Sequence, residues 1–271
     1  AVLNEEERNR ESASQMFRTA QSTTHLYDRY HYPTIGLRHD IQTTTAQDMK
    51  QFRQKYYKLN NCTFLVVGHI FTPEILKTFE KIYGDIPKED EVNHIYPQEP
   101  AQTGKRIVEL NLPASCPMVC MSWISPPSNT KESVVMNVLN RILSDQEKGR
   151  GKKLVSTGVI HNVGCYSPRN VGSYMFLLHG AFGTHTKEAV VKGEAKLQEM
   201  IDTIATHGVS DHELKEAIES LQYEWGVEPF ENIHTTTMAI GEAIGIGNWK
   251  DISQRLETLK TITSKNIQQF C

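Results

Sequence analysis

Residues 56–87, YYKLNNCTFLVVGHIFTPEILKTFEKIYGDIP, combine several patterns in one stretch. Asn60 and Asn61 predict a turn, because asparagine tolerates left-handed backbone and hydrogen-bonds to nearby backbone groups. Residues 63–67 form a short apolar run, rich in β-branched side chains and closed by Gly68, which predicts a buried strand. The first half of the stretch therefore predicts a turn followed by a strand.

The second half of the stretch predicts a helix. Thr72, Pro73 and Glu74 supply a hydroxyl cap, a proline at the first helical position and an acid in the first turn. Gly84 predicts the helix end. Between these signals, apolar side chains recur at helical spacing: Ile75, Leu76, Phe79, Ile82 and Tyr83. The whole stretch thus predicts a strand packed by one helix.

Length and composition fit a globular protein of two ordinary domains. The chain has 271 residues, of which 38% are hydrophobic and 23% charged, and its net charge is −3. This balance predicts neither disorder nor nucleic-acid binding, and no apolar run reaches membrane-spanning length. Because the sequence begins with Ala1 inside a predicted helix, we expect a fragment, so the compartment stays open between cytoplasm and periplasm.

The five cysteines predict neither a disulfide framework nor a metal site. Their number is odd and their spacing wide. Cys116 and Cys120 form C-x3-C, but their surroundings predict a strand and no second Cys/His pair stands at ligand spacing. We interpret both as small apolar core residues.

The remaining chain alternates strands and helices. Residues 45–48 and 210–213 predict capping boxes, each at the start of a helix. Residues 105–110, 118–124 and 173–182 predict strands, whereas residues 134–143 and 186–205 predict amphipathic helices. Residues 147–153, EKGRGKK, lack P-loop spacing and predict a flexible loop. Periodicity alone leaves α+β and α/β folds equally open.

The segments around this core resemble a known family. Residues 56–87, the loop YDRYHYPTIGLRHDI at 27–41 and the run THGVSDHELKEAIESL at 206–221 all resemble insulinase-like (pitrilysin-type, M16) zinc peptidases of the bacterial type. The resemblance implies an α+β fold of two related domains, each a mainly antiparallel sheet with helices on one face, as in LuxS/M16-like metallopeptidases. It implies that residues 1–95 are the C-terminal part of the first, zinc-bearing domain, that 96–104 are a linker and that 105–271 form the second domain. The first domain would then be incomplete.

The opening residues VLNEEERN resemble the family's V-x-N-E segment, whose glutamate is the third zinc ligand. This match selects Glu5 as the ligand, with Glu6 in reserve. From composition alone, the acidic cluster favours a solvated helix face, so the ligand role is what the resemblance implies. The other two ligands and the catalytic base of the family lie on an H-x-x-E-H helix, and this sequence contains no such motif. Because a catalytic zinc needs three protein ligands and an open water position, we expect this chain to bind no catalytic zinc and to cleave no peptide by itself.

The segment LVSTGVI at 154–160 resembles the family's L-V-x-T-G-L-A segment. Partner halves that grip substrate carry an arginine and a tyrosine there, where this chain has Leu154 and His161. The second domain is thus similar to that of a zinc-bearing half, and the resemblance implies a second M16-like half, or a dimer partner, and peptide substrates. His161 is expected to be a structural or surface residue.

Three functions follow as hypotheses. The first is part of a zinc metalloendopeptidase that hydrolyses peptides in a closed chamber. The second is a non-catalytic relative that serves as a scaffold or assembly subunit. The third, a cofactor-binding α/β enzyme, rests only on Gly241, Gly245 and Gly247, which follow a helical stretch instead of a strand and so fit dinucleotide binding poorly.

Overall fold

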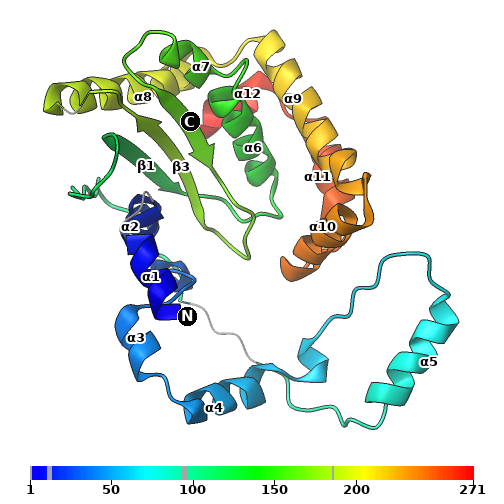
Figure 1. The fold of residues 1–271 in the computed structure, drawn as a ribbon. Coiled ribbons are helices and arrows are strands. Elements are labelled where there is room, and N and C mark those ends of the chain that lie inside the picture. Colours follow the sequence, from blue (N-terminus) through cyan, green and yellow to red (C-terminus); the bar gives the residue numbers. More distant parts are fainter. Residues whose placement is uncertain (1, 11–13, 93–96, 185) are drawn as a thin grey trace.

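The computed structural model describes residues 2–10, 14–92, 97–184 and 186–271. Figure 1 shows two contrasting parts, a compact body that contains the sheet and an extended arm that carries α3, α4 and α5. The helices, with η for 3-10 turns, are α1 Val2–Arg10, α2 Ser14–Thr24, η1 Arg29–His31, α3 Arg38–Thr43, α4 Ala46–Tyr56, η2 Leu59–Asn61, α5 Thr72–Tyr83, α6 Lys131–Ser144, α7 Arg150–Val155, α8 Lys187–His207, α9 Asp211–Gly226, η3 Glu228–Phe230, α10 Ile233–Gly245, α11 Asp251–Leu259 and α12 Ser264–Phe270.

The sheet of the body has three strands, β1 Met118–Ile124, β2 Asn162–Tyr166 and β3 Met175–Ala181. Their order is β1-β3-β2, and both pairs are antiparallel. Cys120, His179 and Gly164 lie opposite one another across the three strands, which fixes the register. Helices together with an antiparallel sheet confirm the α+β prediction.

The two faces of the sheet have different covers. Phe176 and Leu178 of β3 point into a large apolar core with buried residues of α6, α8, α9 and α12. Met175 and Leu177 alternate to the opposite face, where Phe17 and Ala20 of α2 pack against them. Helix α2, near the beginning of the chain, therefore covers the second face of a sheet whose strands come about a hundred residues later and beyond.

Several helix starts have the predicted caps. Thr45 with Asp48 and Ser210 with Glu213 form capping boxes at the starts of α4 and α9, which confirms both predictions. The predicted hydroxyl cap of α5 is wrong: Phe71 is the N-cap and makes no side-chain cap hydrogen bond, while Thr72 is the first helical residue. Pro73 is therefore the second helical residue and not the first, while Gly84 stands at the C-cap as predicted.

The predicted buried strand at residues 63–67 is wrong in this structure. The segment belongs to no sheet, and Phe64 is 51% exposed although its ring packs on Phe79 and Tyr83 of α5. A strand needs a hydrogen-bonded neighbour, and none of the described residues pairs with this segment. The sequence pattern predicts a preference for strand, whereas pairing depends on a partner.

Two further predicted elements differ. Residues 105–110 also remain outside the sheet, with Ile107 72% exposed, because no described strand pairs with them. Residues 147–153 are not wholly a loop, since α7 begins at Arg150. Its first turn packs Gly151 so closely on Val163 of β2 that an added Cβ would lie 2.8 Å away. Glycine at this position therefore allows the helix to lie on the strand, which the glycine-rich pattern did not reveal.

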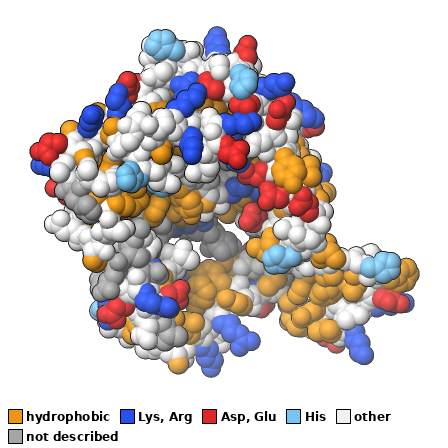
Figure 2. Space-filling model, turned by 45° about the horizontal axis from the view of Figure 1, so that its top comes forward, with side chains coloured by type: hydrophobic (Ala, Val, Ile, Leu, Met, Phe, Trp, Pro, Cys, Tyr) orange, Lys and Arg blue, Asp and Glu red, His pale blue; other side chains and the backbone are white. Residues whose placement is uncertain are grey.

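The arm leaves much apolar surface uncovered. No residue of α5 is buried, and Figure 2 shows hydrophobic side chains gathered on the projecting arm. The exposed apolar residues of residues 62–86 are Phe64, Val66, Ile70, Phe71, Leu76, Ile82 and Ile86. An apolar patch of this kind is unusual on the surface of a monomeric protein.

Candidate functional site

The acidic helix α1 presents its two candidate ligands in different environments. Glu5 is exposed, whereas Glu6 is only 5% exposed. The Oε2 atom of Glu6 accepts a 3.1 Å hydrogen bond from Nη1 of Arg38, the first residue of α3. Because consecutive residues of a helix point about 100° apart, the two carboxylates face different directions. Glu6 is committed to α3, and Glu5 is directed to solvent.

Glu5 is the predicted zinc ligand among the described residues. A carboxylate oxygen is a suitable zinc ligand, so the chemistry of Glu5 fits that role. Among the residues that the structure describes, however, no group of three His, Cys, Asp or Glu side chains could hold a metal ion. Within the described part of the chain, Glu5 therefore has no further donors beside it that would complete a zinc site.

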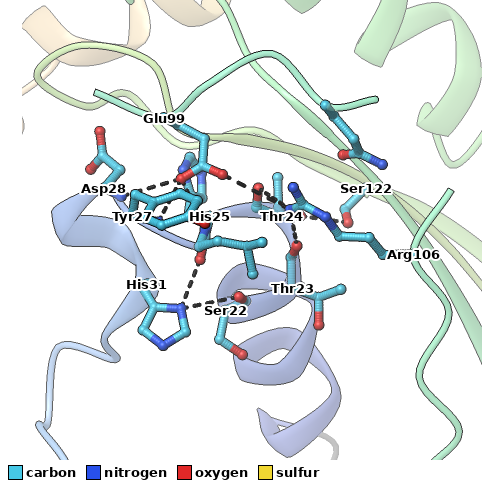
Figure 3. Close-up of polar contacts among 12 residues, drawn as sticks. Ser22, Thr23, Thr24, His25, Tyr27, Asp28, His31, Glu99, Arg106 and Ser122 are labelled. Carbon is cyan, nitrogen blue, oxygen red and sulfur yellow. Dashed lines mark hydrogen bonds and ion pairs between the residues drawn. The ribbon is translucent and has the colours of Figure 1, made fainter. Parts of the chain in front are cut away.

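A polar network holds the end of α2, the helix that follows α1. Figure 3 shows Arg106 directed at the last turn of α2, where its Nη1 donates to the carbonyl oxygens of Thr23 at 2.7 Å and Thr24 at 3.3 Å. Nδ1 of His31 lies 2.8 Å from the carbonyl oxygen of His25. Because that oxygen can only accept, this nitrogen carries the proton. Both contacts satisfy carbonyl groups that a helix end leaves unpaired.

Glu99 fixes the loop that follows α2. Its Oε2 accepts hydrogen bonds from the backbone N–H groups of Leu26, Tyr27 and Asp28, at 2.9, 2.8 and 3.2 Å. Burial raises the pKa of the Glu99 carboxyl, but these three donors outweigh it and the pKa is lowered. Glu99 therefore remains a carboxylate that ties the connecting segment to the loop (Figure 3).

Side chains of the sheet complete the attachment of α2. Thr24 and Ser122 of β1 share a hydrogen bond of 2.6 Å between their hydroxyl oxygens, and the hydroxyl of Tyr174 donates to Oε1 of Gln21 at 3.0 Å. The buried ring of His25 stacks on Tyr174 with centroids 5.8 Å apart. Burial lowers the pKa of His25, with the carboxylates of Asp28 and Glu99 acting in the opposite direction. The ring is thus held neutral inside the contact.

A hollow of about 410 Å³ opens beside this contact. Arg29 and Tyr30 line one wall and residues 169–171 a second. The end of α10 forms the third through Glu242, Gly245 and the following residue, Ile246. Both arginines are engaged: Arg29 donates to the carbonyl oxygen of Val171, and Arg169 pairs with Asp251. The hollow is therefore framed by internal contacts.

The other predicted residues lie on ordinary surfaces or in the core. His161 is exposed and lies against Gly183, as expected for a surface histidine. Cys120 packs on the α2 face of the sheet, where burial raises its pKa to about 12. Cys116 and Cys120 are free thiols.

Sequence reasoning missed Arg38, Glu99 and Arg106. Each acts on a residue far away in the sequence: Arg38 lies 32 positions from Glu6, Glu99 lies 73 from Leu26 and Arg106 lies 83 from Thr23. No periodic pattern marks such contacts, because they depend on the arrangement of elements. The sequence offered one local signal for Arg38: it stands two residues after Gly36, a glycine that predicts a turn.

The sequence of the body and arm matches a known family. Residues 43–221 match the family described as the peptidase M16 inactive domain, and this range is more than half of the chain. The chain belongs to the peptidase M16 inactive-domain family. The matched range begins after α1, so it leaves the ligand role of Glu5 untested.

A curated relative of this M16 chain is the zinc protease PqqE of Helicobacter pylori. The two are 28% identical over 156 residues, which is 52% of this chain and 34% of that protein. The chain therefore spans about a third of the length of this relative.

Solved structures share the fold of the M16 chain. A protease from Helicobacter pylori has a TM-score of 0.89 at 17% identity, covering 99% of this chain and 66% of that chain. A peptidase M16 inactive domain from Pseudomonas fluorescens has a TM-score of 0.83 at 15% identity, covering 99% and 64%. Because these matches cover nearly all of the M16 chain, the arm is part of the shared fold. About a third of each solved chain has no counterpart here.

Among the described residues, no helix combines the length and apolar composition needed to cross a bilayer.

Proposed function

We propose that this chain is part of a zinc-dependent metalloendopeptidase of the insulinase family and is inactive by itself. The observation that carries the proposal is that the Glu5 carboxylate is exposed. The neighbouring Glu6 is already hydrogen-bonded to Arg38, so α1 is held in place while Glu5 stays accessible. The name of the zinc protease relative supports the same reading. Glu5 would then be the third zinc ligand, and Glu6 would not.

The remaining ligands would come from polypeptide outside this chain. Zinc bound by such a site would activate water for attack on a peptide carbonyl. Within this chain, Glu5 would supply a carboxylate oxygen, and α1 would present it toward the incoming polypeptide. An exposed position is what a ligand needs when its metal and partner ligands arrive from elsewhere.

The arm supports the proposal of an incomplete first domain. Residues 63–67 and α5 expose an apolar surface, and about a third of each of the two solved chains lies outside the part that this chain matches. We infer that the missing polypeptide pairs with residues 63–67 and covers α5. Domain limits at residues 95 and 105 remain part of this proposal.

The second domain, residues 105–271, would support peptide binding and take no part in peptide hydrolysis. It has Leu154 and His161 at the positions where substrate-gripping halves have an arginine and a tyrosine, so a second M16-like half would supply that function. The expected partners are therefore an unstructured peptide and another M16-like half, in the same chain or in a dimer.

Peptide hydrolysis tests the proposal. The longer protein that contains residues 1–271 should cleave a fluorogenic peptide library, lose the activity with a zinc chelator and regain it with added zinc. The variant Glu5→Gln should be inactive, whereas Glu188→Gln, altered at an exposed acidic residue of α8, should retain activity. A folded long protein that binds no zinc and cleaves nothing would instead favour the scaffold function.

A further inference from the structure

The carboxylate of Glu6 is the most buried acidic group of α1. Its side chain is 6% exposed, although the helix itself is polar and Glu5 and Glu7 are exposed. A buried carboxylate is costly unless a charged partner and hydrogen bonds compensate it. Arg38 provides that partner at 3.1 Å and lies 4.0 Å from the carboxylate of Glu7 as well.

Arg38 lies on an anchored segment, so its ion pair with Glu6 holds α1 in place. Arg38 opens α3, directly after a turn in which Gly36 has a φ of +83° and its N–H donates to the carbonyl oxygen of Pro33 at 2.8 Å. The loop that precedes this turn is also anchored, because Gln21 of α2 donates hydrogen bonds to the carbonyl oxygens of Tyr30 and Tyr32. The guanidinium is thus presented to α1 from a well-anchored segment.

We propose that Arg38 is a positioning residue, which acts through Glu6 to set the rotation of α1 and so directs Glu5 outward as a metal ligand. The inference rests on the proposed ligand role of Glu5. Because Glu5 and Glu6 are about 100° apart around the helix, fixing Glu6 fixes the direction of Glu5. The pair serves the metal site without touching the metal.

The first test uses the chain of 271 residues itself. Hydrogen exchange of the α1 amides should become about tenfold faster in Arg38→Met, because the variant leaves a buried carboxylate without its guanidinium. Arg38→Lys should restore part of the protection. Arg53→Met, altered at an exposed arginine of α4, is the matched control and should leave α1 unchanged. Unchanged exchange of α1 in Arg38→Met would overturn the inference.

The second test measures zinc in the longer protein. Arg38→Met and Glu6→Gln should weaken zinc binding about 10–100-fold, as changes behind a metal ligand do. Arg38→Lys should recover part of the affinity, and the visible spectrum of the cobalt-substituted protein should shift in Arg38→Met. A thermal unfolding curve of each variant verifies that the protein is folded.

The outcomes separate the two proposals. If Glu5→Gln keeps its zinc, the ligand role of Glu5 is wrong and the inference falls with it. If Glu5→Gln loses zinc while Arg38→Met binds it as tightly as the unaltered protein, the proposed function stands and the positioning role of Arg38 is refuted.

Discussion

Glu213 illustrates how one residue joins two elements. Its carboxylate completes the capping box of α9 and accepts hydrogen bonds from Nε of Arg150 at 2.8 Å and Nη2 at 3.1 Å. These bonds, led by that from Arg150, lower the pKa of Glu213 to about 2. The Ser210-x-x-Glu213 spacing predicted the cap. Arg150 stands 63 positions away, so no local pattern could predict the ion pair that links α7 to α9.

The lowered pKa of Glu213 predicts acid sensitivity. A carboxyl whose folded pKa lies below its ordinary value of 4.5 stabilises the protein above that pH, and the stabilisation is lost as the pH falls toward 2. Glu213→Gln should lower the free energy of unfolding at neutral pH by about 1–3 kcal/mol and flatten its decline below pH 4.5. Urea unfolding across this range measures both effects, and an unchanged pH profile would count against the pair.

His25 predicts sensitivity nearer neutral pH. Burial lowers the pKa of the His25 ring below 6.5, against the opposing effects of the Asp28 carboxylate and the Tyr174 backbone. The unfolded chain then binds a proton that the folded ring resists, so stability should decline as the pH falls below 6.5. His25→Phe should cost less than about 1.5 kcal/mol at neutral pH and reduce that decline. The part due to His179, whose pKa burial also lowers, should persist.

At the scale of elements, apolar spacing predicted helices better than strands. The stripe of α6 identified Val134, Val138, Leu139 and Leu143, all of them buried. A helix satisfies its own backbone, so its pattern suffices for prediction. Residues 63–67 and 105–110 carry strand patterns but lie outside the sheet, because a strand also needs a neighbour. The packing of α2 on the sheet could not be predicted from the sequence, since it depends on tertiary contacts.

The burial of α6 and the exposure of α5 can be compared directly. Leu143→Ala should lower the free energy of unfolding by about 2–5 kcal/mol, because it leaves a cavity in the core. The same change at Leu76 of α5, which is 62% exposed, should cost less than about 0.5 kcal/mol. Equilibrium denaturation of the two variants tests the difference. Equal costs would mean that α5 is covered when the chain is alone in solution.

At the scale of the whole molecule, the beginning of the chain packs on the sheet formed by its later part. Helix α2 lies on the sheet, and Arg106 and Glu99 hold the segment after it. The arm, by contrast, exposes most of its apolar side chains (Figure 2). The sequence predicted two consecutive units joined by a linker. It could not predict that residues 14–32 would pack on the later unit.

This arrangement predicts the outcome of limited proteolysis. Trypsin should cut first in the arm, at exposed basic residues such as Lys50, Arg53 and Lys55 of α4. The piece that contains α2 should then remain bound to the piece that contains the sheet through gel filtration under native conditions. Dissociation of the two pieces would contradict the packing of α2 on the sheet.

The central claim, that Glu5 completes a zinc centre formed with polypeptide outside this chain, is tested most directly by elemental analysis. The longer protein should retain about one zinc ion per chain after dialysis, as a three-ligand catalytic site does, and Glu5→Gln should retain none while remaining folded. Equal zinc contents in the two proteins would contradict the claim.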